Sequence, residues 1–503
     1  MIMSSLEHLL GGFLIVLTPL NLLYCFLGCL WGTIIGVLPG IGPLGGMALL
    51  LPLTFKLDPA SSIIMLAGIF YGTMYGGSTT SILLNIPGEA ASIVTCLDGY
   101  RMARNGRAGP ALVVSALGSF VGGTLSIIAL MFFAPPLAQV MLKVGPAEEF
   151  SLMILALLVV SFVGSSNVLK TVAMIILGLM IATVGMDPLT GHLRFTFGYL
   201  GFASGIDFVP MAIGLFGISE ILINFENIAS MEVIKPSFRT LLPRWEDLKA
   251  SWGSMFRGAG IGILFGFLPG ASHIISTFVS YALEKKISKH PEEFGSGKIE
   301  GVAGPESANN ATTGTSLVPM LVLGIPPLPA TALLMSALII HGITPGPQLV
   351  QEHPDIFWGL IASMYVGNIM LLILNLPLVG MFVNFLRIPY AYLAPSILTL
   401  MIIGVYGVNT NTADILLMVF FGIAGYLLRK FRFDMAPLIL AAVLGDKMEM
   451  SFRRALTISE GSLLIFFKSS VSKIFLVAVI LILILQGMAW FMGFRRRMAE
   501  EAE

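Results

Sequence analysis

Charged residues are scarce in this chain. They make up 11% of its 503 residues, against roughly 25% in soluble globular domains. Hydrophobic residues make up 56%, and the mean hydropathy is +0.91. So few charges cannot cover a water-facing surface, which excludes an ordinary soluble protein and leaves the lipid bilayer as its surroundings. The 28 basic and 28 acidic residues cancel, so no net field attracts nucleic acid and we expect no such partner.

Cysteine and histidine are also scarce. Cys25, Cys29 and Cys96 are an odd number and give no disulfide framework. The six histidines show no ligand spacing, so we expect no metal site and no cofactor. No GxxxxGK[ST] loop is present, which excludes ATP hydrolysis by that route. The first twenty residues lack a basic segment and a cleavage site, and we interpret them as mature protein.

Long apolar runs are what the chain has instead. At about 20 residues per spanning helix, its length allows roughly ten to thirteen crossings. A membrane barrel would alternate apolar and polar residues, whereas these runs are apolar on every face, and helices are the other way to satisfy the backbone in lipid. The sequence therefore predicts an all-α polytopic membrane protein. The clearest runs are 111–133, 150–163, 171–186, 205–223, 357–382, 391–407, 415–428 and 474–492.

Loop charges predict the orientation, because cytoplasmic loops carry an excess of Lys and Arg. Four basic loops are placed in the cytoplasm, and three loops without Lys or Arg are placed outside. The C-terminal fifth stays open, because the run 434–445 is short for a full crossing. The basic loops are 97–109, 231–257, 284–298 and 429–432; the others are 187–192, 341–356 and 408–414.

One pattern occurs twice. GVLPGIGP begins at Gly36 and GFLPGASH begins at Gly266, each inside an apolar region. About fifty residues later each copy has a second polar, Gly- and Pro-containing interruption, at 75–92 and at 305–331. We therefore expect two repeats. The predicted organisation is a first transmembrane repeat at 1–230, a cytoplasmic connector at 231–256 and a second transmembrane repeat at 257–503.

The loops that follow the second interruptions differ in charge. The loop 97–109 carries three arginines, whereas 341–356 carries no Lys or Arg. Opposite charge at equivalent loops predicts inverted-topology repeats, in which substrate and coupling ions bind near the midplane between broken helices. Both Leu-Pro-Gly turns, Pro39-Gly40 and Pro269-Gly270, are interpreted as tips of re-entrant hairpins, with a kinked ordinary helix as the alternative.

The two interruptions supply the candidate substrate-binding residues. Free main-chain groups at half-helix ends can hold anions or cations, and uncharged Ser, Thr and Asn side chains suit a carboxylate without a fixed ion pair. The alternative is that these small residues only let helices pack closely. The candidates are Pro39, Gly40, Gly42, Gly76, Gly77, Ser78, Thr79, Thr80, Asn85, Gly88, Gly270, Asn309, Asn310, Thr312 and Thr313.

Acidic residues at membrane depth are candidate ion sites. Glu89, Asp98 and Glu306 flank the two interruptions and are candidates for binding a coupling H⁺ or Na⁺. The alternative for each is a solvated carboxylate at the interface. His273, at the second Leu-Pro-Gly turn, is a further substrate contact or a solvated loop histidine.

At these residues the sequence resembles a known family. GVLPGIGP, the run 75–112, FGSGKIEGVAGPESANN at 294–310 and HGITPGP at 341–347 look like the TctA-type large permease subunit of tripartite tricarboxylate transporters. The resemblance implies a prokaryotic cytoplasmic-membrane carrier of about twelve helices. It also implies a small four-helix membrane subunit, a periplasmic solute-binding protein and H⁺- or Na⁺-driven uptake of citrate-like or other small carboxylates.

The chain departs from that pattern at Ala271-Ser272-His273 and at Pro326-Pro327, so its substrate can differ from a tricarboxylate. Two other classes stay open from the residues alone. A membrane-embedded enzyme acting on a lipid would need paired acids or a His/Asp cluster, and neither pairing is found. An anion channel would need like residues in rings. We therefore expect a transporter and no enzymatic activity.

Overall fold

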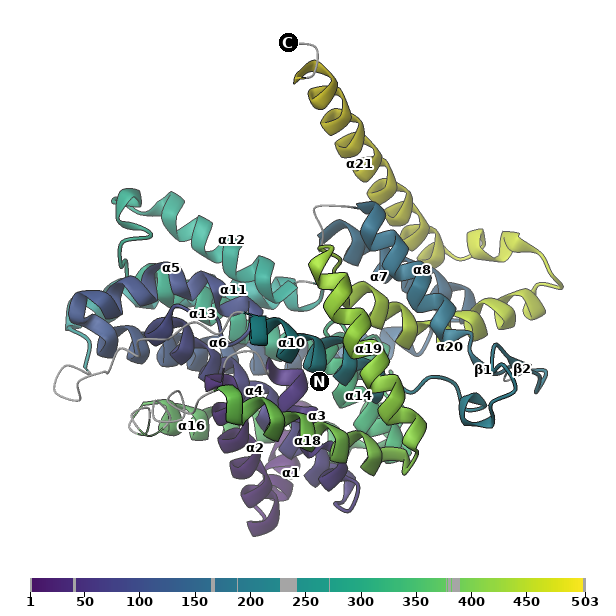
Figure 1. Ribbon diagram of the computed structural model, residues 1–503, viewed down its shortest axis with the longest axis horizontal. Helices are drawn as coiled ribbons and strands as arrows, with labels where there is room; N and C mark the ends of the chain where they lie inside the picture. The colour runs from purple at the N-terminus through teal and green to yellow at the C-terminus, as the bar shows by residue number, and fades with distance from the viewer. Residues whose placement is uncertain are drawn as a thin grey trace. The chain divides into compact units, whose positions relative to one another are not determined.

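The computed structural model describes residues 2–500 except 39–41, 164–167, 188, 227–241, 271, 377, 379–380 and 382–389. The described residues are overwhelmingly helical and form two compact units. The larger unit comprises the residues up to Gln139, Asp207–Phe267 and Ser272–Leu427. The smaller unit comprises Val140–Ile206, Leu268–Ala271 and the residues from Leu428 onward. Figure 1 labels the elements along the chain.

The larger unit is entirely helical in its described residues. Its elements are α1 (Ile2–Val16), α2 (Pro19–Val37), α3 (Gly42–Thr54), α4 (Pro59–Leu84), η1 (Ala90–Ser92), α5 (Ile93–Met102), η2 (Ala103–Arg107), most of α6 (Ala108–Met141), α9 (Phe208–Ala212), η4 (Ile213–Ile218), α10 (Ser219–Glu226), α11 (Trp245–Gly266), α12 (Ser272–Ile287), η6 (Pro291–Glu293), α13 (Glu300–Thr315), η7 (Pro319–Leu323), α14 (Pro329–Ile340), α15 (Leu349–Glu352), α16 (Pro354–Asn375), α18 (Tyr390–Asn409) and most of α19 (Thr412–Lys430).

The smaller unit combines helices with one short antiparallel ribbon. Its elements are α7 (Pro146–Val163), α8 (Val168–Ala182), β1 (Gly185–Met186), β2 (Leu193–Arg194), η3 (Leu200–Phe202), α20 (Ala436–Ile458), η9 (Leu463–Phe467) and α21 (Ser470–Glu500).

Several helices have the length and composition of membrane spans. Four stretches of the described chain qualify, and seven shorter apolar helices accompany them. The prediction of an all-α polytopic membrane protein is thereby confirmed. The number of crossings and the side of each loop stay predictions. The four stretches are Pro19–Val37, Ala90–Met141, Pro354–Asn375 and Thr412–Lys430.

Helices α2 and α4 pack backbone to backbone because glycines recur every four residues along α2. A Cβ added at Gly28, Gly32 or Gly36 would lie 2.3–2.4 Å from a carbonyl oxygen of α4. No side chain fits at that distance, so glycine is required at each position. Close helix contact through small residues is how membrane helices associate without a hydrophobic driving force.

Helices α11 and α13 repeat this arrangement. A Cβ at Gly258 or Gly262 would lie 2.1–2.3 Å from the carbonyl oxygens of Gly304 and Ala308, and one at Gly266 would lie 2.6 Å from the Thr315 Cβ. Figure 1 shows α11 and α13 side by side with α5. Each predicted repeat therefore contains an equivalent pair of close-packed helices, α2 with α4 in the first and α11 with α13 in the second.

The chain then breaks at the same place in both repeats. α4 ends at Asn85 (φ 59°, ψ 30°), and η7 ends at Gly324 (φ 64°, ψ 31°), both in the left-handed conformation. The next helix is capped four residues later in each, at Glu89 and Leu328, whose N–H groups donate to the Ser92 and Thr331 hydroxyls. Gly and Asn tolerate the left-handed conformation best, which explains both residues.

This geometry corrects one expectation. The sequence placed the interruptions at 75–92 and 305–331, but residues 75–84 and 305–315 lie inside α4 and α13, where the backbone is paired. The interruptions fall later, at 85–89 and 324–328. A π-helical turn, Pro319–Leu323, precedes the second one, because Pro319 has no N–H to continue the helix.

The second Leu-Pro-Gly turn joins α11 to α12 through Gly270, whose φ of 107° favours glycine. Arg257 of α11 and the buried Glu284 of α12 form a bidentate pair at 2.8 and 2.6 Å, which ties the two arms of this hairpin together. In the first hairpin, Pro39 and Gly40 lie outside the described residues. The compact units do not follow the boundaries expected at 230 and 257, which therefore stay a prediction of repeat limits.

In the smaller unit, α7, α8 and α20 pack together, and ion pairs bind the ribbon to α20. Arg453 contacts Asp187 at 3.0 Å, and Arg194 contacts Glu449 at 2.8 Å. The backbone N–H groups of Leu189 and Thr190, with Arg453, hold the pKa of the Asp187 carboxyl at about 2. The ribbon is therefore fixed by charge rather than by an apolar core.

Candidate functional site

The two interruptions predicted from the sequence meet inside the larger unit. α4 is buried from Ser61 to Leu83 and α13 from Gly301 to Thr315. Helices buried on every face have no lipid-facing side. The polar residues on both helices therefore lie in the protein interior, and the contacts below join one repeat to the other.

Glu306 is the centre of this region. Its side chain projects from α13, is 1% exposed, and accepts hydrogen bonds from three helices of the first repeat. Ser78 of α4 donates at 2.5 Å, Ser119 of α6 donates at 3.3 Å, and Thr95 of α5 donates to the other oxygen. In the described part of the chain no Lys, Arg or His side chain pairs with Glu306. A carboxyl group is thus enclosed by hydroxyl groups alone.

Glu89 and Asn309 form a second link between the repeats. Glu89 follows the first break, and its oxygens accept from Ala91 N–H at 2.6 Å and from the Asn309 side-chain amide at 3.0 Å. The side-chain oxygen of Asn309 (Oδ1) is buried and has no hydrogen-bond partner among the described residues. Asn309 therefore keeps one acceptor available beside a carboxyl group.

Further along α13, Thr313 contacts the start of α12. The His273 Nε2 atom lies 2.9 Å from the Thr313 hydroxyl, and the His273 ring meets Phe70 edge-on, with ring centroids 6.3 Å apart. The neighbouring Ser272 hydroxyl is buried and has no partner in the described residues. His273 is thus part of the interior rather than a solvated loop residue.

Asp98 has a different setting from the other two candidate acids. It is fully buried and accepts from the backbone N–H groups of Gly295, Gly297 and Lys298 at 2.7–2.9 Å and from the Tyr281 hydroxyl at 2.9 Å. This loop leads directly into α13, whose N-terminus favours negative charge. Four donors already satisfy the carboxylate, which favours a structural role in fixing the 295–298 loop.

The candidate glycines are explained by close packing. A Cβ at Gly76 would lie 2.4 Å from Thr33 O, and one at Gly88 would lie 2.4 Å from the Gly77 Cα and 2.5 Å from Gly36 O. The loop after the first break therefore rests directly on the backbone of α2 and α4. Gly42 is an exception, because a Cβ there would meet nothing within 4 Å. Its φ of 63°, rather than close packing, favours glycine at this position.

The remaining candidates divide between packing and capping. Thr80 donates to Val37 O at 2.7 Å and satisfies a carbonyl at the end of α2, while Thr312 donates across to Gly262 O at 3.2 Å. Asn310 donates to Glu306 O at 3.2 Å, and Thr79 is buried within α4. Asn85 is exposed, so its conformation rather than its amide explains its place.

Sequence reasoning missed three members of the cluster, Thr95, Ser115 and Ser119. All are hydroxyl residues in ordinary-looking helical runs, and none carries a spacing signal of its own. Thr95 lies within the run that resembles the known family, which is the one signal that could have found it. Their roles arise only when three helices close around Glu306.

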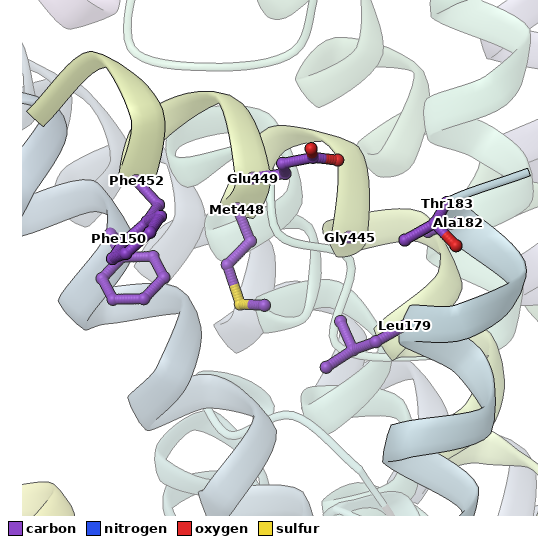
Figure 2. Close-up of a pocket in the computed structure, with 8 residues that line it drawn as sticks. All are labelled: Phe150, Leu179, Ala182, Thr183, Gly445, Met448, Glu449 and Phe452. Atoms are coloured by element: carbon purple, nitrogen blue, oxygen red, sulfur yellow. The ribbon is translucent and has the colours of Figure 1, made fainter. Parts of the chain in front are cut away.

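An apolar pocket of about 210 Å³ lies in the smaller unit, between α7, α8 and α20. Figure 2 shows Phe150, Leu179 and Met448 facing it, with Glu449 at one side. Glu449 is paired with Arg194 and Arg453. The Thr183 hydroxyl of this lining already donates to Met180 O, and the lining carries no cationic side chain, so the pocket is unsuited to a carboxylate substrate.

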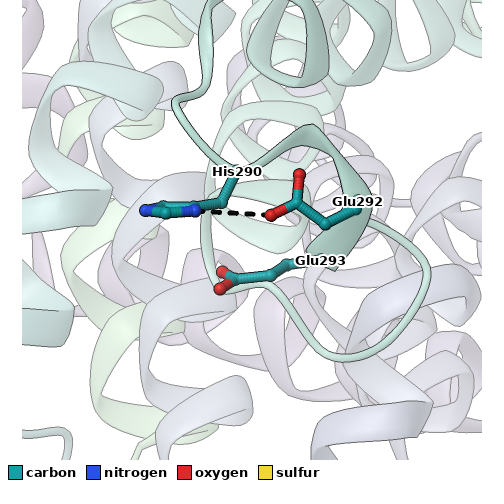
Figure 3. Close-up of side chains that lie close together, drawn as sticks. All are labelled: His290, Glu292 and Glu293. Atoms are coloured by element: carbon teal, nitrogen blue, oxygen red, sulfur yellow. Dashed lines mark hydrogen bonds and ion pairs between the residues drawn. The ribbon is translucent and has the colours of Figure 1, made fainter.

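An exposed group on the loop after α12 is the one described set of three side chains with metal-ligand proximity. Figure 3 shows His290, Glu292 and Glu293 around the η6 turn. His290 contacts Glu292 at 3.3 Å, whereas Glu293 pairs with Lys298, which lowers the pKa of the Glu293 carboxyl. All three are exposed, and these pairings are those of an ordinary solvated loop.

The fold and the buried cluster define a polytopic membrane protein with a polar centre. Comparison with known proteins agrees with this class. The family model "Tripartite tricarboxylate transporter TctA family" matches residues 22–440. A protein of Agrobacterium vitis, "Uncharacterized 52.8 kDa protein in TAR-I ttuC' 3'region", is 49% identical over 464 residues, 92% of each chain.

Two further relatives are shorter matches. "Uncharacterized protein in TAR-II ttuC' 3'region" from Agrobacterium vitis is 50% identical over 205 residues, 41% of this chain and 85% of the relative. An uncharacterized protein of Methanocaldococcus jannaschii is 34% identical over 116 residues, 22% of this chain and 28% of the relative. No solved structure matches.

The chain belongs to the TctA family of tripartite tricarboxylate transporters. The resemblance drawn from the Leu-Pro-Gly turn and the 75–112 run is thereby confirmed. The family is a transporter family, and membership implies a tripartite system with other subunits.

Proposed function

We propose that the chain is the large permease subunit of a secondary active transporter that takes up citrate-like tricarboxylates or related small carboxylates. An H⁺ or Na⁺ gradient across the cytoplasmic membrane of a prokaryote drives uptake. A periplasmic solute-binding protein delivers the substrate, and a small four-helix membrane subunit accompanies the chain. Family membership supports the class of transporter, and the buried polar cluster supports ion-coupled uptake.

One observation carries the proposal. Glu306 and Glu89 lie where the first repeat contacts the second, and both are held by uncharged donors. An ionised carboxylate without a cation is costly in a low-dielectric interior. Each acid therefore needs a cation whenever it is charged. Buried acids with that requirement are suited to bind a coupling ion and release it on the other side.

The second repeat offers donors for an anionic substrate. The Ser272 hydroxyl has no partner in the described chain and begins α12, a helix of 16 residues. Free N–H groups at such a helix start attract a carboxylate. Thr313 and His273 lie beside this point, and Asn309 is one turn away on α13. These uncharged groups would hold a carboxylate without a fixed ion pair.

Solute counterflow in proteoliposomes tests the proposal. The purified complex, with its binding protein, is reconstituted with an unlabelled carboxylate inside and a labelled one outside. A carrier exchanges the label and transiently concentrates it, a channel only equilibrates it, and an enzyme changes the compound. Counterflow with citrate or a smaller di- or tricarboxylate supports the proposal, and equilibration or chemical change refutes it.

A variant locates the site within the same assay. We expect Asn309→Ala to lower exchange at least tenfold, a loss of about 1.4 kcal/mol or more in binding, because it removes both the Glu89 contact and the open acceptor. Asn411→Ala, at the turn before α19, is the matched control and should exchange at the wild-type rate. Equal exchange in Asn309→Ala would remove this residue from the site.

A further inference from the structure

We infer that Glu306 is the residue that binds the coupling cation, and that this cation is a proton held between Glu306 and Ser78. The inference rests on the proposed function and selects one of the two ions that it leaves open. It follows from the hydroxyl groups around Glu306, from the charges near it, and from its place between the repeats.

The first observation is the chemistry of the enclosure. Oxygen–hydrogen donors reach Glu306 from α4, α5 and α6, and the side chain is 1% exposed. Hydroxyl groups can donate to a carboxylate and can also accept from a carboxylic acid. The same enclosure therefore accommodates both protonation states of Glu306 by rotating O–H bonds, without moving a helix.

The second observation is a competition at Ser78. Its one hydroxyl hydrogen has two acceptors in reach, Met74 O at 3.2 Å and the Glu306 carboxyl at 2.5 Å. When Glu306 is protonated, its O–H donates to Ser78, and Ser78 donates to Met74 O. Both groups are then satisfied. The 2.5 Å separation also leaves no room for a metal ion between these two oxygens, which favours H⁺ over Na⁺ at this point.

The third observation concerns charge. Two cationic side chains on the elements packed against Glu306 have other partners: Arg257 is engaged with Glu284, and His273 contacts Thr313. The remaining cations of these elements, Arg101, Lys249, Lys285 and Lys286, are exposed. None of the described cations neutralises Glu306, so a proton is the compensation that the site itself supports. The other titratable groups are Tyr71 and Tyr75 on α4, Glu89 after the first break, Cys96, Asp98 and Tyr100 on α5, Glu246 and Asp247 on α11, Tyr281 and Glu284 on α12, and Glu300 on α13.

The fourth observation is location. Glu306 belongs to the second repeat, and its hydroxyl partners on α4, α5 and α6 belong to the first. Loss of the proton would place an uncompensated charge at this contact and weaken the conformation described here. Binding and release of the proton would therefore bias the movement of one repeat against the other, which is how transporters of this architecture alternate access.

The test is Glu306→Gln in the reconstituted complex with its binding protein and small subunit. Gln is neutral, keeps a donor and an acceptor, and mimics the protonated acid. We expect Glu306→Gln to retain counterflow of labelled carboxylate but to lose accumulation driven by an inward pH gradient. We also expect substrate-dependent acidification of the lumen, followed with a trapped pH dye, to disappear.

Two further variants complete the design. Glu293→Gln changes an exposed carboxyl on the η6 loop and should leave pH-driven accumulation at the wild-type level. Ser78→Ala removes the proton-sharing hydroxyl and should shift the pH dependence of accumulation. Glu89→Gln tests the neighbouring acid, and loss of coupling there with full coupling in Glu306→Gln would overturn the assignment.

The outcomes separate this inference from the proposed function. If wild-type liposomes show no carboxylate counterflow, the proposed function fails. If they show counterflow but accumulate substrate on a Na⁺ gradient with no lumen acidification, the proton assignment fails and the transport function stands. The acidification measurement uses wild-type protein, so it decides whether the coupling ion is H⁺ even if Glu306→Gln does not fold.

Discussion

The two repeats have the same backbone and different chemistry. In the first, α2 rests on α4 through Gly28, Gly32 and Gly36, and in the second, α11 rests on α13 through Gly258, Gly262 and Gly266. Both then break at a left-handed residue. The framework is therefore symmetric, since glycine and a left-handed cap are required at matching places.

The side chains at matching places are not symmetric. Glu306 and Asn309 of α13 correspond to Ala67 and Phe70 of α4, and Glu89 after the first break corresponds to Leu328 after the second. The acids and the amide therefore occur once, at the contact between the first break and α13. A duplicated frame with one polar centre is the arrangement that the proposed movement of one repeat against the other requires.

The frame itself gives the largest expected effect. Gly262→Val should destabilise the protein by at least about 3 kcal/mol, because overpacking in a filled interior costs that much and the new side chain would start 2.3 Å from Ala308 O. Gly32→Val should cost a similar amount if the repeats are equivalent. Thermal melting in detergent measures both losses.

A matched control lies on the same helix. Gly260 is exposed, and a Cβ there meets nothing within 4 Å, so Gly260→Val should melt as the wild type does. A large loss in Gly262→Val with none in Gly32→Val would break the comparison between the two helix pairs.

An ion pair present in one repeat gives the next effect. Arg257 and Glu284 join α11 to α12, whereas Leu27 and Thr54 stand at the corresponding places of the first hairpin. Arg257→Ala leaves Glu284, 3% exposed, without its partner and should cost about 3 kcal/mol. The double variant Arg257→Leu with Glu284→Thr copies the first hairpin and should recover most of that loss in the same melting assay.

The left-handed caps give a smaller effect. Asn85→Ala and Gly324→Ala should each cost about 1–2 kcal/mol, because other residues pay a steric penalty in this conformation. Asn85→Gly and Gly324→Asn exchange the two caps and should be nearly neutral. A large loss in Asn85→Gly would instead mean that the Asn85 amide makes a contact, as the sequence alone had suggested.

Much of this frame could be predicted from the sequence, because it depends on local signals. The two Leu-Pro-Gly turns, the paired interruptions and their order are visible as Gly, Pro and Asn at fixed places. The exact breaks could not be predicted. In the sequence, Gly76 and Gly77 are compatible with a turn and with a close helix contact. The structure shows the contact, because the Thr33 carbonyl oxygen would lie 2.4 Å from a Cβ at Gly76.

The polar centre was predicted in part. Glu306, Asn309 and Glu89 were candidates because acids and amides are rare in apolar runs. Thr95 and Ser119 were not, because hydroxyl residues are common in membrane helices and become a site only through tertiary contact. Asp98 was a candidate ion site, but three of its donors come from the 295–298 loop and the fourth from Tyr281 of α12, all far away in sequence, which no local pattern reveals.

The smallest expected effect on stability concerns the β1–β2 ribbon of the smaller unit, which is not part of either close-packed helix pair. The carboxyl of Asp187 has a folded pKa of about 2, below the ordinary value of about 3.9 for an unfolded chain. A depressed folded pKa stabilises the protein above the unfolded value and ceases to do so as the pH falls through the folded one. We therefore expect the melting temperature to fall between about pH 4 and pH 2 because of this group.

Asp187→Asn isolates this contribution. The variant should melt slightly lower than the wild type at neutral pH, because Arg453 loses one of its two acidic partners and keeps Glu449, and the difference should vanish toward pH 2. Asp355→Asn, at the start of α16, replaces another loop carboxyl and should keep a constant offset across the same range. A constant offset in Asp187→Asn as well would show that the ribbon is held by its backbone pairing, and the charge network would then be incidental to the fold.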